Sequence, residues 1–468
     1  MSLTEAEIRS IVEDTVRQLA GSHTAATAGA GCWLCDTAEE AIASAKAAQK
    51  QLIAMSLDQR GRLIEAMRGA ARENAQHLAE MAHEETGYGK VEDKVKKNLL
   101  AANKTPGIED LSAAALSGDY GLTLMERAPF GVIGSITPST NPPSSIINNS
   151  ISMIAAGNAV VFNPHPAAKK VSTEAMRILN EAIVCAGGPA ALICTVKEPT
   201  LATGKVIMEH PDVPLLSITG GEAVVKVAMK TGKKVVAAGP GNPPVIVDDT
   251  ADIPQAAKDI VDGASFDNNV LCIAEKEVFA FACIAEQLMS EMEKNGAFRI
   301  SGADIDKVIK TVLENKDGKF APNRKFVGRD ATVILRASGV AFTGEPRLVI
   351  AAVDENHPFI TTEMLMPVLG VATVNTIEEA IAKAIKAENG CHHTAMMHSQ
   401  NVTRLSMAAK ALDTTIFIKN APSYAGLGFG GEGFASLTIA TPTGEGVTSA
   451  RTFTRIRRCV LYGNFRIV

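Results

Sequence analysis

Among the eight cysteines of the 468-residue chain, Cys272 has the most unusual surroundings. It lies between the end of an expected helix and the start of an expected strand, directly behind the polar residues Asp267, Asn268 and Asn269. A thiol on a loop that a rigid scaffold positions can serve as a nucleophile, although a small buried thiol is the commoner fate of a cysteine. The residues alone therefore make Cys272 a candidate nucleophile, with a buried structural thiol as the alternative.

Three polar loops follow expected strands and could bind a dinucleotide. They are residues 136–142 (ITPSTNP), 162–166 (FNPHP) and 218–226 (ITGGEAVVK). The last one places Thr219, Gly220 and Gly221 at the start of a helix, where backbone N–H groups and the helix dipole favour a phosphate. Each loop taken singly is compatible with ordinary turn chemistry. Three of them on one sheet edge favour a cofactor site.

Gly426, Gly428 and Gly431 match the spacing of the dinucleotide fingerprint G-x-G-x-x-G. The segment follows a strand but opens no helix, so the structural context that gives the fingerprint its chemistry is missing. We expect a flexible active-site or packing loop here.

Two further groups of residues have the types of metal ligands without the pattern. Cys32 and Cys35 form a C-x-x-C motif, but no second pair stands at zinc spacing and the motif lies in an expected tether region. The second group is Cys391, His392, His393 and His398. No matching carboxylate or histidine motif accompanies it, so we expect no metal site.

Composition excludes several classes of protein. The chain has 46 Lys and Arg against 51 Asp and Glu, a net charge of −5, which argues against a nucleic-acid binder. No apolar run approaches the roughly 18 residues of a membrane span, and no secretory signal is evident. Eight cysteines without a dense framework indicate reduced thiols in the cytoplasm.

Near-continuous apolar strands alternate with helices from residue 131 onward. The expected strands of this first block are residues 131–137, 159–164, 191–196, 213–220 and 234–239. Such strands are typical of a doubly wound parallel sheet, whose ligand crevice lies at the carboxyl ends of the strands. A second α/β block follows, with strands expected at 245–249, 275–281 and 414–420 and helices at 253–265 and 377–387. The fold class is therefore α/β.

The two ends of the chain have patterns of their own. Residues 1–20 have apolar side chains at helical spacing and are followed by a small, glycine-containing tether at 21–31, which is typical of an amphipathic helix that binds a partner or docks on its own protein. Helical spacing also covers residues 36–85, and the terminal RRCVLYGNF suits an edge strand or an intersubunit hairpin.

Taken together, several motifs resemble those of the aldehyde dehydrogenase superfamily. They are ITPSTNP, GNAVVFNPHPAAKK, ITGG, GPGNPPVIV, FDNNVLC, TTEMLMPVLG and TPTGEGVTSARTFTRIRRCVLYG, in the order of that family and over nearly the whole chain after residue 32. The chain is more closely similar to the CoA-acylating branch, which includes the acetaldehyde and propionaldehyde dehydrogenases of bacterial microcompartments. The resemblance implies an aldehyde dehydrogenase-like fold with an NAD-binding domain, a catalytic domain and a β oligomerisation hairpin.

The resemblance also implies the chemistry. The thiolate of Cys272 attacks the aldehyde carbonyl, and the resulting oxyanion is held by the Asn141 amide and the Cys272 backbone N–H. Hydride passes to NAD, and the thioester on Cys272 is then transferred to coenzyme A. The expected substrate is a short-chain aldehyde, with propionaldehyde favoured and acetaldehyde next.

Three positions qualify this assignment. Ala238 stands where hydrolytic relatives carry a water-activating glutamate; a thiol supplies its own thiolate whereas water needs a base, so thiolysis is favoured. Asn163 stands where hydrolytic relatives usually have a lysine that contacts the adenosine ribose, so the choice between NAD and NADP stays open. Glu363 matches the family glutamate that holds the nicotinamide ribose. The implied cofactor-binding residues are Thr137, Pro138, Ser139, Asn163, His165, Pro166, Thr219, Gly220, Gly221, Val224, Ala238, Gly239, Glu363 and Leu365.

The resemblance divides the chain as follows. Residues 1–20 resemble an encapsulation peptide that binds microcompartment shell proteins, 21–31 a linker, 32–239 the NAD- and CoA-binding domain with 116–130 in the oligomerisation hairpin, 240–425 the catalytic thiol domain, and 426–468 a return to the cofactor domain with the oligomerisation strand. It implies a homo-oligomer, dimer or tetramer, in the microcompartment lumen. The alternatives are a hydrolytic aldehyde dehydrogenase or acyl-phosphate reductase on the same fold, and a non-catalytic shell-binding scaffold.

Overall fold

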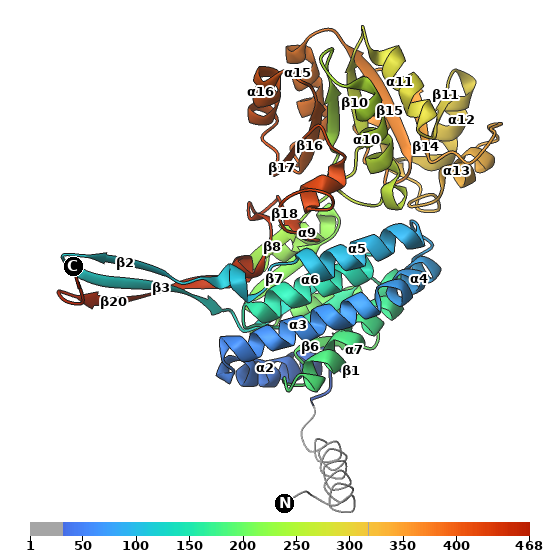
Figure 1. The fold of residues 1–468 in the computed structure, drawn as a ribbon. Helices are drawn as coiled ribbons and strands as arrows, with labels where there is room; N and C mark the ends of the chain where they lie inside the picture. Colours follow the sequence, from blue (N-terminus) through green and yellow to red (C-terminus); the bar gives the residue numbers. More distant parts are fainter. Residues whose placement is uncertain (1–30, 317) are drawn as a thin grey trace, which may run out of the picture.

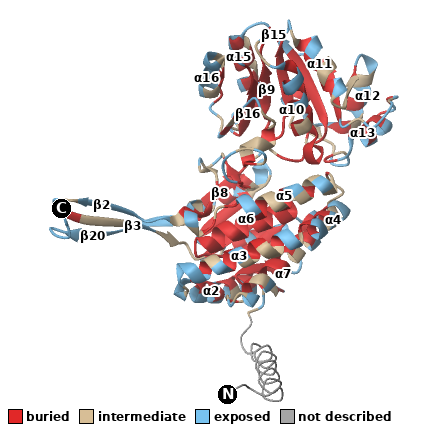
Figure 2. Ribbon diagram, in the orientation of Figure 1, coloured by how far each residue is buried: buried red, intermediate tan, exposed pale blue. Residues whose placement is uncertain are grey.

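Two parallel β-sheets and a projecting three-stranded arm make up the described part of the chain (Figure 1). The computed structural model describes residues 31–316 and 318–468, so the expected helix at 1–20 and nearly all of the linker at 21–31 lie outside the described residues. Buried residues gather in the sheets and the helices around them, whereas the arm is mostly exposed or half-buried (Figure 2). The α/β class predicted from the sequence is confirmed.

The first sheet has the strand order β1-β6-β5-β4-β7-β8, and all its neighbouring strands run parallel. Its strands are β1 (Leu34–Cys35), β4 (Val132–Thr137), β5 (Ala159–Pro164), β6 (Ile193–Val196), β7 (Leu215–Thr219) and β8 (Lys234–Ala238). The chain leaves β4 toward β5 and β6 on one side and returns to β7 and β8 on the other. The order therefore reverses between β4 and β7, which is where open α/β sheets bind their ligands.

Strand β1 corrects one expectation. Cys32 and Cys35 were placed in the tether region, but Leu34 pairs with Thr195 of β6 and Cys35 is buried. A two-residue strand is too short to show a periodic pattern, so the sequence does not predict it. The C-x-x-C segment is therefore part of the first sheet, not of a tether.

Helices of the first block pack against the sheet, α2 and α8 as one group and α6 and α7 as another. They are α2 (Ala38–Ala54), α3 (Leu57–Glu73), α4 (Ala75–Thr86), α5 (Val91–Lys104), α6 (Pro142–Ala155), α7 (Lys169–Cys185), α8 (Leu201–Glu209) and α9 (Glu222–Met229). Helix α6 packs on β4 and β5 and is buried over its whole length, because α3, α5 and α7 surround it. It begins directly after the loop 138–141, so its burial holds that loop at the sheet edge.

The second sheet has the order β11-β14-β15-β10-β9-β16-β17, again with all neighbours parallel. Its strands are β9 (Pro244–Val247), β10 (Glu277–Phe281), β11 (Ala297–Ile300), β14 (Leu348–Ala352), β15 (Val368–Val374), β16 (Thr394–His398) and β17 (Ile416–Lys419). Its helices are α10 (Ile253–Ser265), α11 (Ala285–Lys294), α12 (Ala303–Val312), α13 (Ala331–Ala337), α14 (Pro358–Thr361), α15 (Ile377–Glu388) and α16 (Val402–Leu412). Cys272 lies on the connection between α10 and β10.

Short strands complete the fold. The arm consists of β2 (Ala114–Gly118), β3 (Gly121–Pro129) and β20 (Thr454–Tyr462), with β20 antiparallel to β3 as the predicted hairpin requires. A small hairpin of β12 (Leu313–Lys316) and β13 (Lys319–Pro322) leaves the second block, and β18 (Ile439–Ala440) pairs with β19 (Gly446–Val447). In the part of the chain described here, no helix is long and apolar enough to cross a membrane.

Candidate active site

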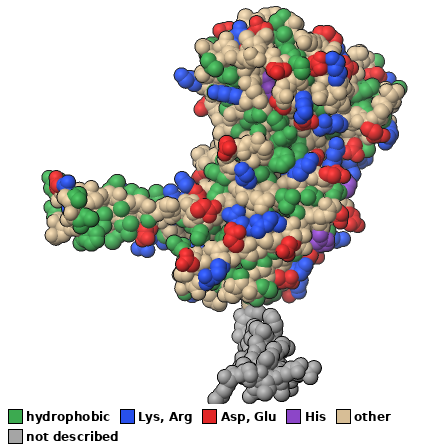
Figure 3. Space-filling view, in the orientation of Figure 1, with side chains coloured by type: hydrophobic (Ala, Val, Ile, Leu, Met, Phe, Trp, Pro, Cys, Tyr) green, Lys and Arg blue, Asp and Glu red, His purple; other side chains and the backbone are tan. Residues whose placement is uncertain are grey.

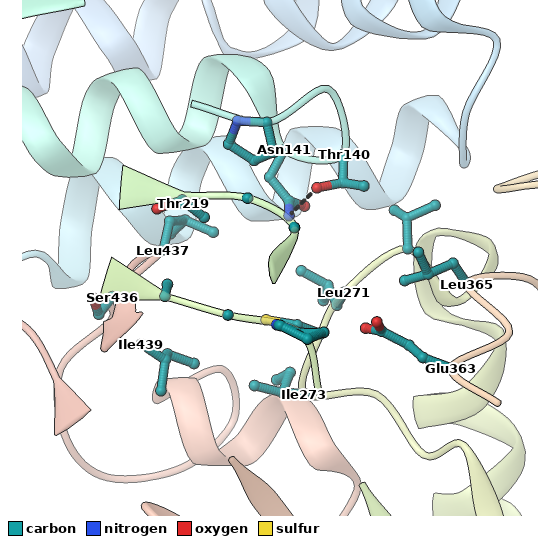
Figure 4. Close-up of a pocket in the computed structure, with 18 of the residues that line it drawn as sticks. Thr140, Asn141, Thr219, Leu271, Ile273, Glu363, Leu365, Ser436, Leu437 and Ile439 are labelled. Atoms are coloured by element: carbon teal, nitrogen blue, oxygen red, sulfur yellow. Dashed lines mark hydrogen bonds between the residues drawn. The ribbon is translucent and has the colours of Figure 1, made fainter. Parts of the chain in front are cut away.

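A cavity of about 180 Å³ lies where the edges of the two sheets meet. The loops after β4, β7 and β8 line it from the first block, and the loop that carries Cys272 lines it from the second (Figure 4). Residues from 427 to 439 of the glycine-rich segment close the remaining side. Because the carboxyl ends of parallel strands meet at one sheet edge, side chains distant in sequence converge at this point.

Cys272 is partly exposed and lines this cavity. The three residues Asp267, Asn268 and Asn269 have left-handed φ angles of 47°, 53° and 65°, which is unusual for residues with a side chain. Asn268 Nδ2 donates to Gly328 O at 3.0 Å, and Asn269 Nδ2 donates to Ala264 O at 2.8 Å. The polar residues singled out in the sequence are therefore those that hold the strained turn in front of the thiol.

Burial and, next, the nearby Glu363 carboxyl together raise the pKa of the Cys272 thiol to about 12, while the Lys276 ammonium opposes them. Lys276 is itself buried, and its Nζ donates to Asn269 O at 3.0 Å, to Asn269 Oδ1 at 2.6 Å and to Leu271 O at 3.0 Å. These bonds turn the backbone carbonyl groups of Asn269 and Leu271, which precede Cys272, toward the Lys276 ammonium. The N–H groups of Cys272 and Ile273 favour the thiolate as hydrogen-bond donors.

Asn141 immediately precedes α6 and lines the same cavity. Its Oδ1 accepts a hydrogen bond from Lys97 Nζ at 2.6 Å, and its Nδ2 donates to Thr140 Oγ1 at 3.2 Å (Figure 4). The amide oxygen is thus engaged by a cation away from the cavity. The amide nitrogen is the end that remains for a ligand.

Glu363 and Leu365 reach the cavity from the segment before β15. Burial raises the pKa of Glu363, while Lys276 and a hydrogen bond that Gly241 N donates to Glu363 Oε1 at 3.4 Å lower it. Leu365 has a φ of 52°, so this segment also contains a backbone conformation that is rare outside glycine.

A larger cleft of about 1170 Å³ adjoins the cavity and shares Pro138, Thr140, the loop 219–221 and Leu365 with it. All sixteen residues assigned from the sequence line one or both of these spaces. The cavity contains Asn141, Ala238, Gly239, Cys272 and Glu363; the cleft contains Thr137, Ser139, Asn163, His165, Pro166 and Val224; both contain Pro138, Thr219, Gly220, Gly221 and Leu365.

Both ends of the Asn163 amide are engaged at the start of α8. Its Nδ2 donates to Thr200 O at 3.2 Å and its Oδ1 accepts from Thr203 Oγ1 at 2.7 Å, so it braces the first turn of α8. The neighbouring Leu201 lines the cleft and is 92% exposed. A large apolar side chain held in the open is what a flat aromatic ring would cover.

Sequence reasoning missed two groups of lining residues. The segment 321–325, from β13 onward, lines the cleft, although the sequence shows it only as part of a charged stretch. Leu427, Leu437 and Ile439 line the cavity from the segment predicted to be an active-site or packing loop. Apolar residues inside a glycine-rich run were the available signal for the second group.

The histidines that were considered as metal ligands, His392, His393 and His398, do not converge on one point. His392 is exposed, whereas His393 and His398 are buried at opposite ends of β16. Burial lowers the pKa of each buried histidine to about 4, so both are neutral at pH 7. Within residues 31–316 and 318–468, no three His, Cys, Asp or Glu side chains form a group that could hold a metal ion.

The chain is similar to known proteins of one family. The model of the aldehyde dehydrogenase family matches residues 34–438. The acetylating acetaldehyde dehydrogenase EutE of Salmonella typhimurium is 52% identical over 433 residues, which cover 92% of each protein.

Solved structures are equally similar. A propionaldehyde dehydrogenase from the fucose utilisation bacterial microcompartment of Clostridium phytofermentans has a TM-score of 0.91 at 48% identity, covering 93% of this chain and 100% of that chain. The propionaldehyde dehydrogenase of Rhodopseudomonas palustris, crystallised with bound CoA and an acylated cysteine, has a TM-score of 0.90 at 46% identity, covering 93% of this chain and 99% of that one.

Proposed function

This chain belongs to the aldehyde dehydrogenase family and is a CoA-acylating aldehyde dehydrogenase, and from that premise we propose which of its residues perform the reaction. The enzyme converts a short-chain aldehyde, CoA and NAD to an acyl-CoA and NADH. The observation that carries the proposal is that Cys272, Asn141 and Ala238 line one cavity. Among the described residues that line it, Glu363 is the one carboxylate.

Cys272 is the nucleophile. Its thiolate form, present as a small fraction, bonds through sulfur to the carbonyl carbon of the aldehyde, and the electron pair of the broken C=O π bond passes to the carbonyl oxygen, which becomes an oxyanion. Asn141 Nδ2 and the backbone N–H of Cys272 donate hydrogen bonds to that oxygen, which stabilises charge that develops only during the reaction. Loss of a hydride from the carbon restores the carbonyl and leaves a thioester on Cys272.

The cleft suits NAD. Thr137 Oγ1 is buried, lines the cleft side of β4 and has no hydrogen-bond partner among the described residues, and the exposed Leu201 offers a surface for the adenine. Gly220 and Gly221 let the backbone approach the phosphates, and Glu363 holds the nicotinamide ribose. NAD, when bound there, accepts the hydride.

Ala238 decides how the thioester is resolved. The thiolate of CoA attacks the acyl carbon, and the Cys272 thiolate leaves with its electron pair. Water would need a general base, and an alanine side chain supplies none. Thiolysis by CoA is therefore favoured over hydrolysis.

The first test is NADH formation with propionaldehyde and NAD, with and without CoA, by the wild type and Cys272→Ala. Cys283→Ala is the matched control, because Cys283 is an exposed cysteine that does not line the cavity. We expect sustained turnover only with CoA, abolished by Cys272→Ala and unchanged by Cys283→Ala. Equal turnover without CoA would instead support the hydrolytic alternative, and an active Cys272→Ala enzyme would remove Cys272 from the mechanism. A non-catalytic scaffold would produce no NADH at all.

Residues 1–20 are proposed to bind microcompartment shell proteins, which would place the enzyme in the lumen of a microcompartment. The support is an amphipathic pattern on a small-residue tether, a form suited to docking in a groove. Deleting residues 1–20 should disperse the enzyme from microcompartments. Its NADH production should stay within about twofold of the wild type, because the deletion removes no residue that lines the cavity. Unchanged co-localisation would contradict the proposal.

We also propose that the arm joins copies of this chain into a dimer or tetramer. Strand β20 is nine residues long and lies at the edge of the three-stranded sheet. An exposed edge of this length with apolar side chains favours pairing with another chain.

A further inference from the structure

A buried ion cluster joins helix α5 of the first block to the loop that precedes the nucleophile. Asp267 is fully buried and accepts hydrogen bonds from Lys94 Nζ at 3.2 Å and from Lys90 N at 2.8 Å, and it forms an ion pair with Lys97. Its own backbone N–H donates to Asp93 Oδ2 at 2.9 Å. One carboxylate thus receives two lysines from successive positions of one helix face.

Lys97 has a second acceptor that Lys94 lacks, the Oδ1 atom of Asn141 at 2.6 Å. An ammonium can only donate, so its partner on the asparagine must be the oxygen. The amide nitrogen is thereby turned toward the cavity, where it donates to Thr140 Oγ1 at 3.2 Å. A reversed amide would present an acceptor to the oxyanion, and it would also place two donors against each other at Lys97.

We propose that Lys97 is a positioning residue that fixes the orientation of the Asn141 amide and ties it to the loop of the nucleophile through Asp267. The proposal rests on the proposed role of Asn141 in the reaction. Lys97 is 4% exposed and Asn141 8%, so little water can substitute for the contact. Because the same ammonium touches both partners, oxyanion donor and nucleophile loop are held in one arrangement.

Lys94 provides a matched control for Lys97. Both are buried lysines of α5 that face Asp267, but Lys97 is the one whose contact with Asn141 is observed. After either is replaced by methionine, Asp267 keeps one buried cation. If the lysines act only through structure, the two variants should lose similar amounts of activity. If Lys97 orients the Asn141 amide, the larger loss should appear in Lys97→Met alone.

The experiment measures the single-turnover rate of NADH formation with propionaldehyde for the wild type, Lys97→Met, Lys94→Met, Asn141→Ala and the double variant Lys97→Met/Asn141→Ala. Removing one oxyanion donor typically slows the reaction about 100- to 1000-fold, so Asn141→Ala should fall in that range and Lys97→Met should lose at least about tenfold. Lys94→Met should lose less than about threefold, and Lys97→Met should add less than about threefold in the Asn141→Ala background, because groups that act as a unit are not additive.

Inactivation by iodoacetamide gives an independent readout, since alkylation of a thiol forms no oxyanion. The rate of inactivation by iodoacetamide should therefore stay within about threefold of the wild type in Lys97→Met, the same limit that marks a small effect on NADH formation. Lys97→Arg keeps a buried donor and should restore NADH formation above the level of Lys97→Met. If Lys97→Met does not fold, Lys97→Gln replaces it. The glutamine amide can both donate and accept a hydrogen bond, so it allows either orientation of the Asn141 amide.

Equal losses in Lys97→Met and Lys94→Met, additive losses with Asn141→Ala, or a parallel fall in alkylation would each overturn the positioning role. An Asn141→Ala variant that keeps its full rate would instead refute the proposed function of Asn141 itself. The two failures are thus distinguishable.

Discussion

At the scale of single residues, burial outweighs the neighbouring charges in setting the pKa of Cys272, the proposed nucleophile. The pKa of Cys272 is raised to about 12 by burial first and by the Glu363 carboxyl second, while Lys276 opposes both. In the free enzyme at pH 7 the thiol is therefore protonated, and only a small fraction is the reactive thiolate.

This charge balance predicts the pH dependence of alkylation. A raised pKa means that the thiolate fraction at a fixed pH is smaller, so inactivation by iodoacetamide should rise about tenfold per pH unit between pH 7 and 9, without a plateau. Glu363→Gln removes the carboxylate charge that raises the pKa of Cys272, so inactivation at pH 8 should become faster. Glu432→Gln, on an exposed part of the glycine-rich segment, serves as the control. A plateau below pH 9 in the wild type, or a slower Glu363→Gln variant, would contradict the assignment.

Ala238 carries the second prediction at this scale. A glutamate at this position would bring a general base to the cavity that contains Cys272. Ala238→Glu should gain NADH formation in the absence of CoA, by at least about tenfold over the wild type, within the range typical of general-base catalysis. Ala238→Gln has nearly the same size without a carboxylate and should stay dependent on CoA. Equal CoA-independent rates in both variants would show that space, not basicity, admits the water.

At the scale of elements, the loop between α10 and β10, which carries Cys272, approaches the chain just before α5. The residue at the point of approach is a glycine, Gly89. Gly89 has a φ of 68°, and a Cβ added there would lie 1.7 Å from Asp267 Oδ1. Gly232 has a similar φ of 73°, but nothing lies within 4 Å of its added Cβ. The two positions therefore separate the cost of a left-handed backbone from the cost of a collision with Asp267.

Gly89→Ala should lower the rate of NADH formation at least about tenfold and reduce stability by more than the roughly 1–2 kcal/mol expected for a left-handed alanine. Gly232→Ala should show only the stability loss of about 1–2 kcal/mol and retain its rate within about twofold, because it removes no contact of the site. Rates and melting temperatures measured side by side provide the test. Similar rates in the two variants would show that the loop tolerates the displacement of Asp267.

The elements also show where sequence reasoning succeeds. Buried parallel strands are recognisable as apolar runs, so the loops after β4, β5 and β7 and their residues were predicted. Helix α5 was not, because Lys94 and Lys97 occupy buried positions that a lysine rarely takes, and they obscure the apolar face. Lys276 was missed for the same reason: a charged residue beside a strand suggests the surface until its partners are known.

At the scale of the whole molecule, the site exists only because two sheets contribute to it. The resemblance to a family identified Cys272, Asn141 and Glu363, whereas residue types alone left Cys272 with two interpretations. Contacts across the two blocks, such as Lys97 with Asp267, have no sequence signal, because 170 positions separate the partners. A pattern within one element predicts that element, but charge pairing between blocks becomes visible only in three dimensions.

The arm is the remaining feature at this scale, and its surface predicts an assembly. Ile456, Val460 and Tyr462 share one face of β20 and are 66%, 60% and 79% exposed. Hydrophobic side chains also gather along the face of the arm seen in Figure 3. So much apolar surface on a narrow projection is stabilised when a second copy covers it.

Val460→Asp should therefore dissociate the assembly, because the buried charge would cost several kcal/mol at a contact between copies. Val402→Asp is the matched control, since Val402 is 74% exposed at the start of α16, where an acidic residue suits the helix dipole. Light scattering after size exclusion should give a multiple of the 49.1 kDa chain mass for the wild type and Val402→Asp, and a smaller mass for Val460→Asp. A wild type of single-chain mass, or an unchanged mass in Val460→Asp, would contradict the proposal, because an apolar edge strand that joins the copies cannot accept a buried charge without loss of the assembly.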